Sequence, residues 1–366
     1  MNVLVTGAKG FIGKHTCLSL KRNGHNVFEY DMDSNPGDLE EYIRKCDFII
    51  HLAGINRPLT VEEFYNGNAN FTKHMVDLIR KFKRVDVPVV MSSSIQASLD
   101  NDYGKSKKMG EDFLFNSGLK VYVFRLANAF GKWCRPNYNS AAATFCYNIA
   151  HDLPVEIRDV NYVVHYNYID DIVKTFNDCI NGVIQPTNEV LYVNPTYDCS
   201  LGHLVDLLRY FKQEIESDRH LPIIHDEFEL KLFKTFCDYL CEDEYRDTLN
   251  YASDNRGSFE ELYKSKKYGQ ISENISFPDI TKGGHYHTYK KEIFYTVIGE
   301  CEIKQRNIDN NDLIVNKVTG DNPNPINIIP KYTHSIKNIG KDNSKTIMWI
   351  SEIYNPETAD TYREDV

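Results

Sequence analysis

Four side chains in the C-terminal third of the chain are of the types that hold a divalent transition metal. They are His285, His287 and Glu292, in the order H-x-H-x4-E, and His334 further along. In an extended strand His285 and His287 project to one face, and a short turn can return Glu292 to it. Three imidazoles and a carboxylate suit a first-row divalent metal and leave a position for water or a substrate oxygen. The alternative interpretation is that each histidine is an ordinary packed or exposed strand residue.

A serine, a tyrosine and a lysine in the N-terminal half could transfer a proton at a carbonyl. Tyr103 and Lys107 are four residues apart at the start of a predicted helix, so their side chains share one face. The ammonium of Lys107 is expected to lower the pKa of the phenol from ~10. Tyr103 could then donate a proton to the alkoxide that forms when a hydride reaches a carbonyl carbon, and Ser94 could orient that oxygen. By itself, Y-x-x-x-K is also common at the surface of helices.

A glycine-rich segment near the N-terminus, TGAKGFIG, is predicted to bind a dinucleotide. Its glycines, Gly7, Gly10 and Gly13, follow an apolar strand and open a helix, so free backbone N–H groups can face a pyrophosphate. Asp31 ends the next strand, where an acidic residue meets the ribose 2′-OH of NAD. Lys9 favours NADP instead, because its ammonium could neutralise a 2′-phosphate. The alternative interpretation of the three glycines is a tight strand-to-helix turn, and that of Asp31 is a solvated strand end.

Predicted strands and helices alternate over the first ~180 residues and must position these side chains. Such alternation is typical of βαβ units in a doubly wound α/β domain. Apolar β-branched runs predict strands at 2–6, 26–30, 47–52, 88–92 and 120–124. Apolar residues at three- and four-residue steps predict helices at 11–21, 70–82 and 105–115. Ser94 then lies at the carboxyl edge of the sheet, where ligands bind in such folds.

From about residue 257 the pattern changes to short strands separated by turn signals, which predicts an all-β sandwich or barrel. The strands are expected at 270–276, 293–298, 300–305, 312–318, 326–329, 333–339 and 346–353. Two predicted helices, at 201–211 and 227–240, are assigned to the first domain. We therefore expect a dinucleotide-binding domain over 1–246 and a metal-binding β domain over 247–366.

Composition excludes several classes of protein. The 366 residues carry 42 Lys+Arg and 52 Asp+Glu, a formal charge of −10, which argues against nucleic-acid binding because phosphate affinity needs clustered cations. No apolar stretch reaches the ~20 residues of a membrane span, and no signal peptide is apparent, so we expect a cytoplasmic protein. Nine scattered cysteines do not form a disulfide framework and are expected to be reduced.

On these motifs residues 1–245 resemble the extended short-chain dehydrogenase/reductase family, in its nucleotide-sugar branch. The likeness rests on TGAKGFIG, HLAG, SSS, YGKSK and RLANAFGK. It implies that Ser94, Tyr103 and Lys107 are catalytic. It also implies cofactor contacts from Gly7, Lys9, Gly10, Phe11, Ile12, Gly13, Asp31, Leu52, Ala53, Gly54, Tyr103 and Lys107. The substrate would face Asn128, Trp133 and Asn137, although the loop 133–140 can also be interpreted as a simple surface loop.

The C-terminal segment resembles the cupin family, in particular deoxysugar epimerases with a jelly-roll fold. H-x-H-x4-E is similar to the first cupin motif, and His334 with Asn338 is similar to the second. The turn before His334 departs from the family pattern, since it is one residue shorter and lacks the glycine. The resemblance implies zinc or another first-row divalent metal, with a substrate contacted by Arg256, Gln270 and Asn274.

A reductase joined to such a cupin is similar to bifunctional enzymes of capsule and O-antigen precursor biosynthesis over nearly the whole chain. Shared stretches include HLAGINRP, FGKWCRPNYNS, DNRGSF and TIMW. The resemblance implies a UDP-linked 4-keto-6-deoxy amino sugar, a UDP-2-acetamido-2,6-dideoxy-4-hexulose. The cupin would epimerise C3, and the reductase would reduce the C4 ketone with NADPH to a UDP-N-acetyl-6-deoxy-L-talosamine-type product. A homodimer is also implied.

Two alternatives remain open from the sequence. In one, only the NAD(P)H-dependent reductase is active and the cupin is a structural or oligomerisation module. In the other, the chain binds nucleotide sugars or senses redox state without catalysis. The presence of Ser94, Tyr103 and Lys107 together counts against the second alternative.

Overall fold

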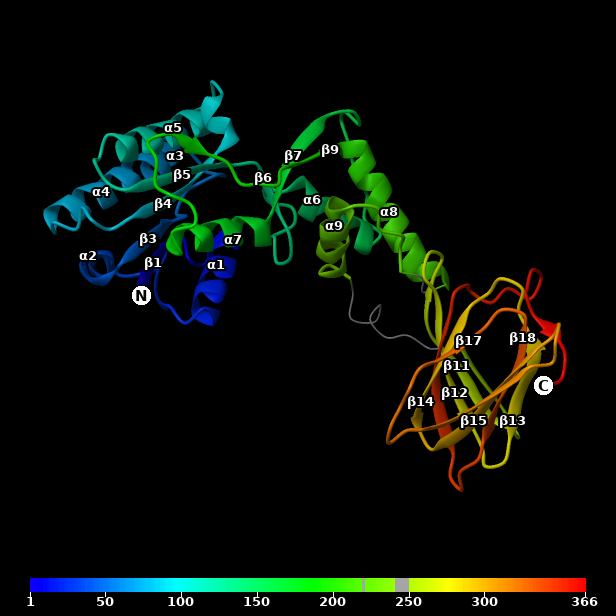
Figure 1. Ribbon diagram of the computed structural model, residues 1–366. Helices are drawn as coiled ribbons and strands as arrows, with labels where there is room; N and C mark the ends of the chain where they lie inside the picture. The colour runs from blue at the N-terminus through cyan, green and yellow to red at the C-terminus, as the bar shows by residue number, and fades with distance from the viewer. Residues whose placement is uncertain (219–220, 241–249) are drawn as a thin grey trace. The chain divides into compact units, whose positions relative to one another are not determined.

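The structure is a computed structural model that describes residues 1–218, 221–240 and 250–366. The chain divides into two compact units (Figure 1). One contains residues 1–208 and 226–240, and the other contains residues 209–225 and 241–366. The predicted boundary between residues 246 and 247 lies outside the described ranges.

The N-terminal unit is built on a six-stranded parallel sheet in the order β2-β1-β3-β4-β5-β8. Its strands are β1 (Asn2–Thr6), β2 (Asn26–Tyr30), β3 (Phe48–His51), β4 (Val89–Ser94), β5 (Val121–Leu126) and β8 (Val190–Leu191). The direction of winding reverses between β1 and β3. Ligands bind in such sheets at this switch point, so the loops that follow β1 and β3 flank the expected cofactor crevice.

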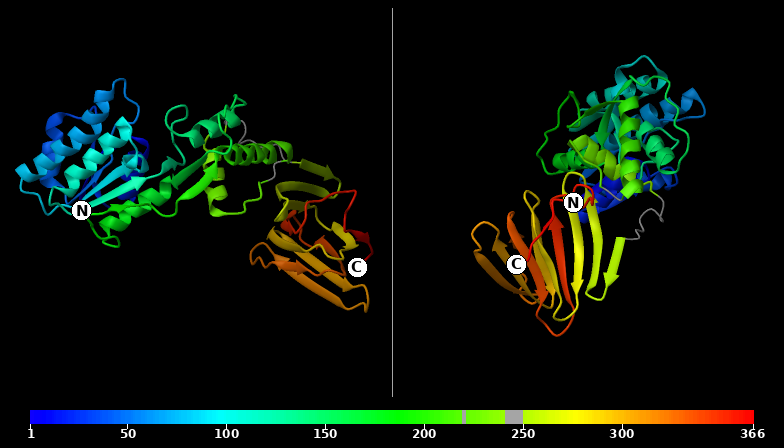
Figure 2. Two further views of the ribbon diagram at one scale, coloured as in Figure 1. Left: turned by 90° about the horizontal axis from the view of Figure 1, so that it is seen from above. Right: turned by 90° about the vertical axis from the view of Figure 1, so that its right-hand side faces the viewer.

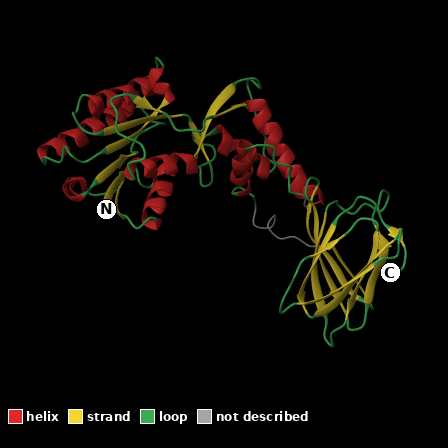
Figure 3. Cartoon of the chain, viewed as in Figure 1, coloured by secondary structure: helices red, strands yellow, loops and turns green. Residues whose placement is uncertain are grey.

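Both faces of this sheet are covered by helices, which confirms the doubly wound α/β prediction (Figure 3). Alternation along β1 sends Leu4 into one core and Val3 and Val5 into the other. The first core packs against α2 (Pro36–Lys45), α4 (Phe71–Lys81) and α5 (Asp102–Phe115), and the second against α1 (Phe11–Arg22) and α7 (Ile169–Ile180). Because both faces are buried, the strands are nearly continuous apolar runs.

The remaining elements extend the first unit beyond the sheet. They are α3 (Val61–Phe64), the π-helix η1 (Tyr65–Asn70), the 3₁₀ helix η2 (Ile95–Ser98), β6 (Asn128–Phe130), α6 (Ala141–Ala150), β7 (Val163–Tyr168), β9 (Tyr197–Ser200), α8 (Leu201–Asp218) and α9 (Glu227–Cys237). Strands β6, β7 and β9 form a separate small sheet. Helix α8 runs seven residues beyond its predicted end and passes into the second unit at Arg209.

The C-terminal unit consists of two antiparallel sheets, which confirms the all-β prediction (Figure 2). One sheet has the order β10-β11-β12-β19-β14-β17 and the other β16-β15-β18-β13-β20. The strands are β10 (Asn250–Asp254), β11 (Gly257–Ser265), β12 (Gly269–Ser276), β13 (Thr281–Tyr286), β14 (Glu292–Ile298), β15 (Glu300–Asn307), β16 (Leu313–Thr319), β17 (Ile326–Ile328), β18 (Tyr332–Asn338), β19 (Ser344–Ile350) and β20 (Tyr362–Arg363). Phe294, Ile303, Ile336 and Met348 form the core between the sheets.

Two further expectations concern the whole chain. In the described ranges, no helix is both long and apolar enough to cross a membrane. The eight cysteines that the structure describes are free thiols, as expected, and Cys241 lies outside the described residues.

Candidate active site and metal centre

The glycine-rich segment forms the tight turn that its spacing predicts. Gly7 has a φ of +69°, and a Cβ placed on it would lie 2.7 Å from the backbone N of Ala53. A Cβ on Gly13 would lie 2.1 Å from the carbonyl O of Gly7. Gly10 is the N-cap of α1, which no side chain caps. The first N–H groups of α1 are therefore available to an anionic ligand, and close backbone approach explains the glycines.

Asp31 and Lys9 lie together at this turn. One carboxylate oxygen of Asp31 accepts a hydrogen bond from the backbone N–H of Lys9 at 2.7 Å, and the other accepts one from Met32 at 2.8 Å. The ammonium of Lys9 forms an ion pair with Asp33, and both side chains are exposed. Because ion pairs at the protein surface contribute little to stability, an anionic ligand could replace Asp33 as the partner of Lys9.

The structure brings Ser94, Tyr103 and Lys107 to one place. Ser94 is the last residue of β4, and α5 begins at Asp102, capped by Asn101, whose side chain accepts the N–H of Gly104 at 2.7 Å. Tyr103 has a hydrogen bond with the side chain of Ser94. The N-cap fixes the first turn of α5, so that Tyr103 and Lys107 face the end of β4.

The pKa of Tyr103 differs from the expectation. Burial raises it, and the interaction that opposes burial is the hydrogen bond with Ser94, not the charge of Lys107. Lys107 is itself buried, and its Nζ donates to the carbonyl O of Ser92 at 3.1 Å. Burial lowers the pKa of Lys107 to about 8, although Glu111 opposes this. Burial therefore shifts the pKa of each group more than the proximity of the other group does. Sequence spacing does not reveal this burial.

Asn68 is a site residue that the sequence analysis missed. It lies in the π-helix η1, is 1% exposed, and its amide donates to the carbonyl O of Ile55 and to Oγ of Ser106, each at 2.9 Å. A Cβ on Gly54 would lie 2.7 Å from Oδ1 of Asn68 and 2.9 Å from Nζ of Lys107. Gly54 thus allows the lysine and the amide to approach the backbone after β3.

A buried hydrogen-bond chain runs beneath the cofactor crevice. His51 Nδ1 lies 2.7 Å from Oγ1 of Thr6, and its Nε2 lies 2.9 Å from Oγ1 of Thr72. Thr6 accepts from the N–H of Ala53 at 3.3 Å, and Thr72 donates to the carbonyl O of Asn68 at 2.6 Å. These partners assign the proton of neutral His51 to Nε2. The chain ties the ends of β1 and β3 to η1, where the cofactor is expected.

Of the three predicted substrate residues of the first unit, Asn128 lies on a short strand, and Trp133 and Asn137 lie on the loop that follows it. The amide of Asn128, in β6, donates to the carbonyl O of His165 at 3.1 Å. Trp133 and Asn137 have left-handed backbones, with φ values of +64° and +54°. The indole of Trp133 is 51% exposed and stacks on His15 with ring centroids 4.5 Å apart. The loop is therefore held against α1, with one face of the indole available.

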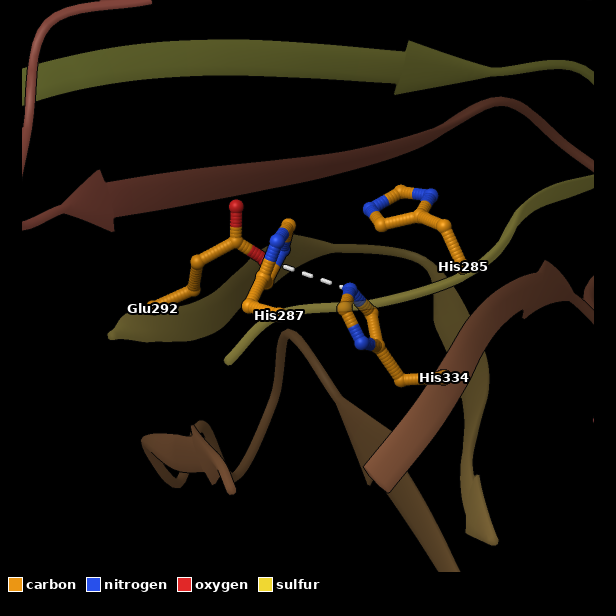
Figure 4. A group of neighbouring side chains, drawn as sticks. All are labelled: His285, His287, Glu292 and His334. Carbon is orange, nitrogen blue, oxygen red and sulfur yellow. Dashed lines mark ion pairs between the residues drawn. The ribbon is translucent and has the colours of Figure 1, made fainter. Parts of the chain in front are cut away.

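In the second unit, His285, His287, Glu292 and His334 converge, as the sequence analysis predicts (Figure 4). One ligand atom from each lies within 4.8 Å of the others. Oε2 of Glu292 is 3.3 Å from Nε2 of His287 and 3.2 Å from Nε2 of His334. These residues come from β13, the turn after it, β14 and β18.

The chemistry of this cluster fits a metal cation. Nε2 of His287 and Nε2 of His334 are buried and lack a hydrogen-bond partner of normal geometry. Burial, followed by the neighbouring His334 and His287, lowers the pKa of His285 to about 4, so its imidazole is neutral at pH 7. Burial alone would raise the pKa of Glu292, but interactions with the two histidines lower it. Neutral imidazoles and an ionised carboxylate are the ligand forms that metals require.

The short turn before His334 is compatible with this cluster. Lys331 adopts a φ of +66°, and its N–H donates to the carbonyl O of His287 at 2.7 Å. A left-handed lysine therefore takes the place of the expected glycine, and it joins the two ligand-bearing segments.

The predicted substrate residues of the second unit are not brought together. Gln270 and Asn274 are buried and belong to the alternating inward face of β12. Gln270 pairs with Ile350, which pairs with Glu292, so Gln270 lies two strands from a metal ligand, or ~10 Å. Arg256 precedes β11 at the other end of β12, is exposed, and forms an ion pair with Asp254 at 2.7 Å. Strand register therefore separates Arg256 from the cluster.

Comparison with known proteins defines the class of this chain. A family model described as the NAD dependent epimerase/dehydratase family matches residues 3–180. A second model, described as the polysaccharide biosynthesis C-terminal domain, matches residues 252–362. The chain is thus an epimerase/dehydratase-type Rossmann unit joined to a β unit found in polysaccharide biosynthesis.

Full-length relatives identify the family. The chain is 39% identical to the UDP-2-acetamido-2,6-beta-L-arabino-hexul-4-ose reductase of Pseudomonas aeruginosa, over 99% of this chain and 98% of the relative. It is 41% identical to the capsular polysaccharide assembling protein CapF of Staphylococcus aureus, with a TM-score of 0.90 and complete coverage of both chains. The chain belongs to the CapF family. The Bacillus cereus UDP-glucuronic acid 4-epimerase, solved with NAD, shares only the fold, at 17% identity, a TM-score of 0.56, and coverage of 67% of this chain and 100% of that chain.

His51→Gln is expected to make stability less sensitive to acid. Burial, with a smaller contribution from Lys107, lowers the pKa of His51 to about 3, against ~6.5 in an unfolded chain. Between these values the unfolded state binds one more proton, so this group makes the native state less stable as pH falls from 6.5 towards 3. Its maximum contribution is about 1.4 kcal/mol per pH unit. Glutamine keeps a donor and an acceptor but does not titrate.

Urea unfolding of the full chain between pH 7 and pH 5 measures this effect. His74→Gln, at an exposed position on the neighbouring α4, is the matched control and should follow the parent. Equal pH slopes for the parent and His51→Gln would contradict the assignment of a neutral buried imidazole.

Proposed function

We propose that this chain is a bifunctional nucleotide-sugar enzyme. The C-terminal unit, as a metal-dependent cupin, epimerises C3 of a UDP-2-acetamido-2,6-dideoxy-4-hexulose, and the N-terminal unit reduces the C4 ketone. The observation that carries the proposal is that one chain holds Ser94, Tyr103 and Lys107 beside a dinucleotide loop, together with a buried cluster of three histidines and one carboxylate. The name of the Pseudomonas relative, a reductase of a UDP-linked 4-ulose, supports the substrate class.

In the reductase unit, the free N–H groups at the start of α1 bind the pyrophosphate of the cofactor, and Gly7, Gly10 and Gly13 allow its close approach. NADP(H), when bound, supplies the hydride. Tyr103 donates its proton to the C4 oxygen as negative charge develops there, and Ser94 orients that oxygen. A raised phenol pKa keeps Tyr103 protonated at neutral pH, which is the form that a proton donor needs.

NADP(H) is proposed over NAD(H) because of the contacts at the glycine-rich turn. Asp31 already accepts hydrogen bonds from two backbone N–H groups, which leaves it fewer lone pairs for a ribose 2′-OH. Among the residues that the structure describes, exposed Lys9 is paired with exposed Asp33 alone, so a 2′-phosphate could take it as a partner. NAD(H) is the alternative cofactor.

In the cupin unit, His285, His287, Glu292 and His334 would hold zinc or another first-row divalent metal. A bound metal supplies Lewis-acid polarisation of the ketone, which acidifies the neighbouring C3 proton. The proposed contact of Gln270 with the sugar is supported by its position on the inward face of β12. Reduction removes the ketone that makes C3 acidic, so epimerisation precedes reduction.

The alternative in which the β unit is purely structural is supported mainly by the absence of a glycine in the turn before His334. Because Lys331 makes that turn in a left-handed conformation, all four ligands converge without the glycine. We therefore favour a catalytic β unit.

We also propose a homodimer formed through the outer face of the β12-containing sheet. Tyr263, Ile271, Trp349 and Ile293 form one cross-strand row on that face, and each is partly exposed. A row of apolar side chains on one face of a sheet is typical of an interaction surface. Ile347→Asp, on the same face, is expected to give a monomer by light scattering, and Lys317→Asp, on exposed β16, should remain dimeric. A monomeric parent would refute this proposal.

Tyr103→Phe tests the reductase. Loss of a general acid typically costs 10²–10⁴-fold in rate, so ketone-dependent oxidation of NADPH should fall by about 10²-fold or more. Tyr65→Phe is the matched control, since Tyr65 lies on neighbouring η1 and bonds only an exposed carboxylate, Asp102. Absorbance at 340 nm with NADPH and NADH in parallel gives both the rate and the cofactor preference. Activity near that of the parent would remove Tyr103 as proton donor.

Solvent exchange tests the epimerase. In heavy water without nicotinamide cofactor, the parent enzyme should place deuterium at C3 of the 4-keto sugar nucleotide, and not at C5, as read by NMR. His334→Gln or a chelator should slow this exchange by more than about 100-fold, because Lewis-acid stabilisation contributes several kcal/mol. His74→Gln should leave it unchanged. With NADPH added in heavy water, a reduced product without any label at C3 would exclude epimerisation.

A further inference from the structure

The last residues of the chain run directly over the cluster of His285, His287, Glu292 and His334. Strand β20 pairs with β13, and its Arg363 lies opposite His285. The N–H of Glu364 donates to the carbonyl O of Gly284 at 3.1 Å. The hydroxyl of Thr333, the neighbour of His334, donates to the carbonyl O of Glu364. Two ligand-bearing strands are therefore bonded to the C-terminal segment.

Asp360 is the centre of this segment. It is 4% exposed, and its carboxylate accepts hydrogen bonds from the N–H of Thr288 at 3.0 Å and from the N–H groups of Tyr289 and Lys290 at 2.9 Å each. The hydroxyl of Thr288 donates to it as well, at 2.7 Å. Burial alone would raise the pKa of Asp360, but these hydrogen bonds hold it well below its usual range. A single ionised carboxylate thus organises the turn between His287 and Glu292.

The backbone of the same residue contacts a ligand. The carbonyl O of Asp360 lies in hydrogen-bond contact with Nδ1 of His287. Since a carbonyl only accepts, Nδ1 carries a proton, so in the neutral imidazole the lone pair is on Nε2, the atom facing Glu292. Fixing the tautomer of a ligand histidine in this way is what outer partners of metal sites do.

We propose that Asp360 is a positioning residue that pre-forms the metal centre, with its carbonyl setting the tautomer of His287 and its carboxylate holding the turn to Glu292. The inference rests on the proposed metal centre. It also gives the C-terminal segment a role in metal affinity, separate from any contact with substrate. Without the carboxylate, three backbone N–H groups of the turn lose their acceptor, and the distance between two ligands is no longer fixed.

The experiment measures zinc affinity of the full-length apoprotein by competition with a chromophoric chelator. Asp360→Asn should bind zinc about 10- to 100-fold more weakly than the parent, which is the usual effect of losing an outer partner. Its visible spectrum with Co²⁺ should also change, because the ligand geometry changes. Asp321→Asn, an exposed carboxylate in the loop after β16, is the matched control. A variant truncated after Thr361 keeps Asp360 but lacks β20, so it separates the contribution of Asp360 to zinc affinity from that of β20.

The outcomes distinguish this inference from the proposed function. A parent that binds no zinc or cobalt refutes the metal centre itself. A parent and an Asp360→Asn variant with equal zinc affinity and equal cobalt spectra refute only the positioning role. The positioning role would also be refuted if the zinc affinity of Asp360→Asn fell only in proportion to the fraction of apoprotein that is unfolded, as measured by thermal unfolding. Should Asp360→Asn fail to fold, Thr288→Val removes a single bond to Asp360, and an unchanged zinc affinity in that variant would refute the role.

Discussion

Both candidate sites depend on charged groups that are buried beside neutral dipoles. Removal of an ion from water costs several kcal/mol unless the protein supplies hydrogen bonds or an opposite charge. In the first unit, the ammonium of Lys107 has the carbonyl O of Ser92 as a partner, with Asn68 close by. In the second, the carboxylate of Glu292 lies between two imidazoles. A buried group held this way is poised for a ligand that completes its solvation, which explains why the cofactor and the metal are expected there.

The side chains that could do chemistry lie on regular elements, but the residues that hold them come from irregular or distant segments. Lys107 is on α5, whereas Asn68 beside it belongs to a π-helix more than thirty residues earlier. His287 follows β13, whereas Asp360, which bonds it, lies near the C-terminus. Strands and helices bring the reactive groups near one another, and these additional contacts set their tautomers and orientations.

The sequence predicts the parts of the structure that depend on local patterns. Strands β1 and β2 begin and end as predicted, because both are short apolar runs bounded by clear turn residues. Helix α2 was missed although Asn35 and Asp38 form a capping box at its start and Pro36 is its first residue. Three of the four candidate metal ligands, His285, His287 and Glu292, could be grouped because they lie close together in the sequence, and only His334 is distant. Asp360 was not found, since no pattern links it to residues seventy positions away. The predicted direction of the pKa shift of Tyr103 was wrong, because the burial that raises this pKa depends on tertiary packing.

The titration behaviour of the two sites allows both proposed reactions to proceed at one pH. His285 is neutral above its pKa of about 4, so this imidazole is in its metal-binding form through the whole neutral range. Tyr103 stays protonated at neutral pH, because burial raises the pKa of its phenol. Lys107, with a pKa of about 8, keeps most of its positive charge below that pH. Neutral His285 and protonated Lys107 therefore coexist between about pH 4 and 8, although one site requires a deprotonated group and the other a protonated one. Burial moves the pKa of His285 down and that of Tyr103 up, and each shift widens the pH range of the neutral form, which is the one that the chemistry needs.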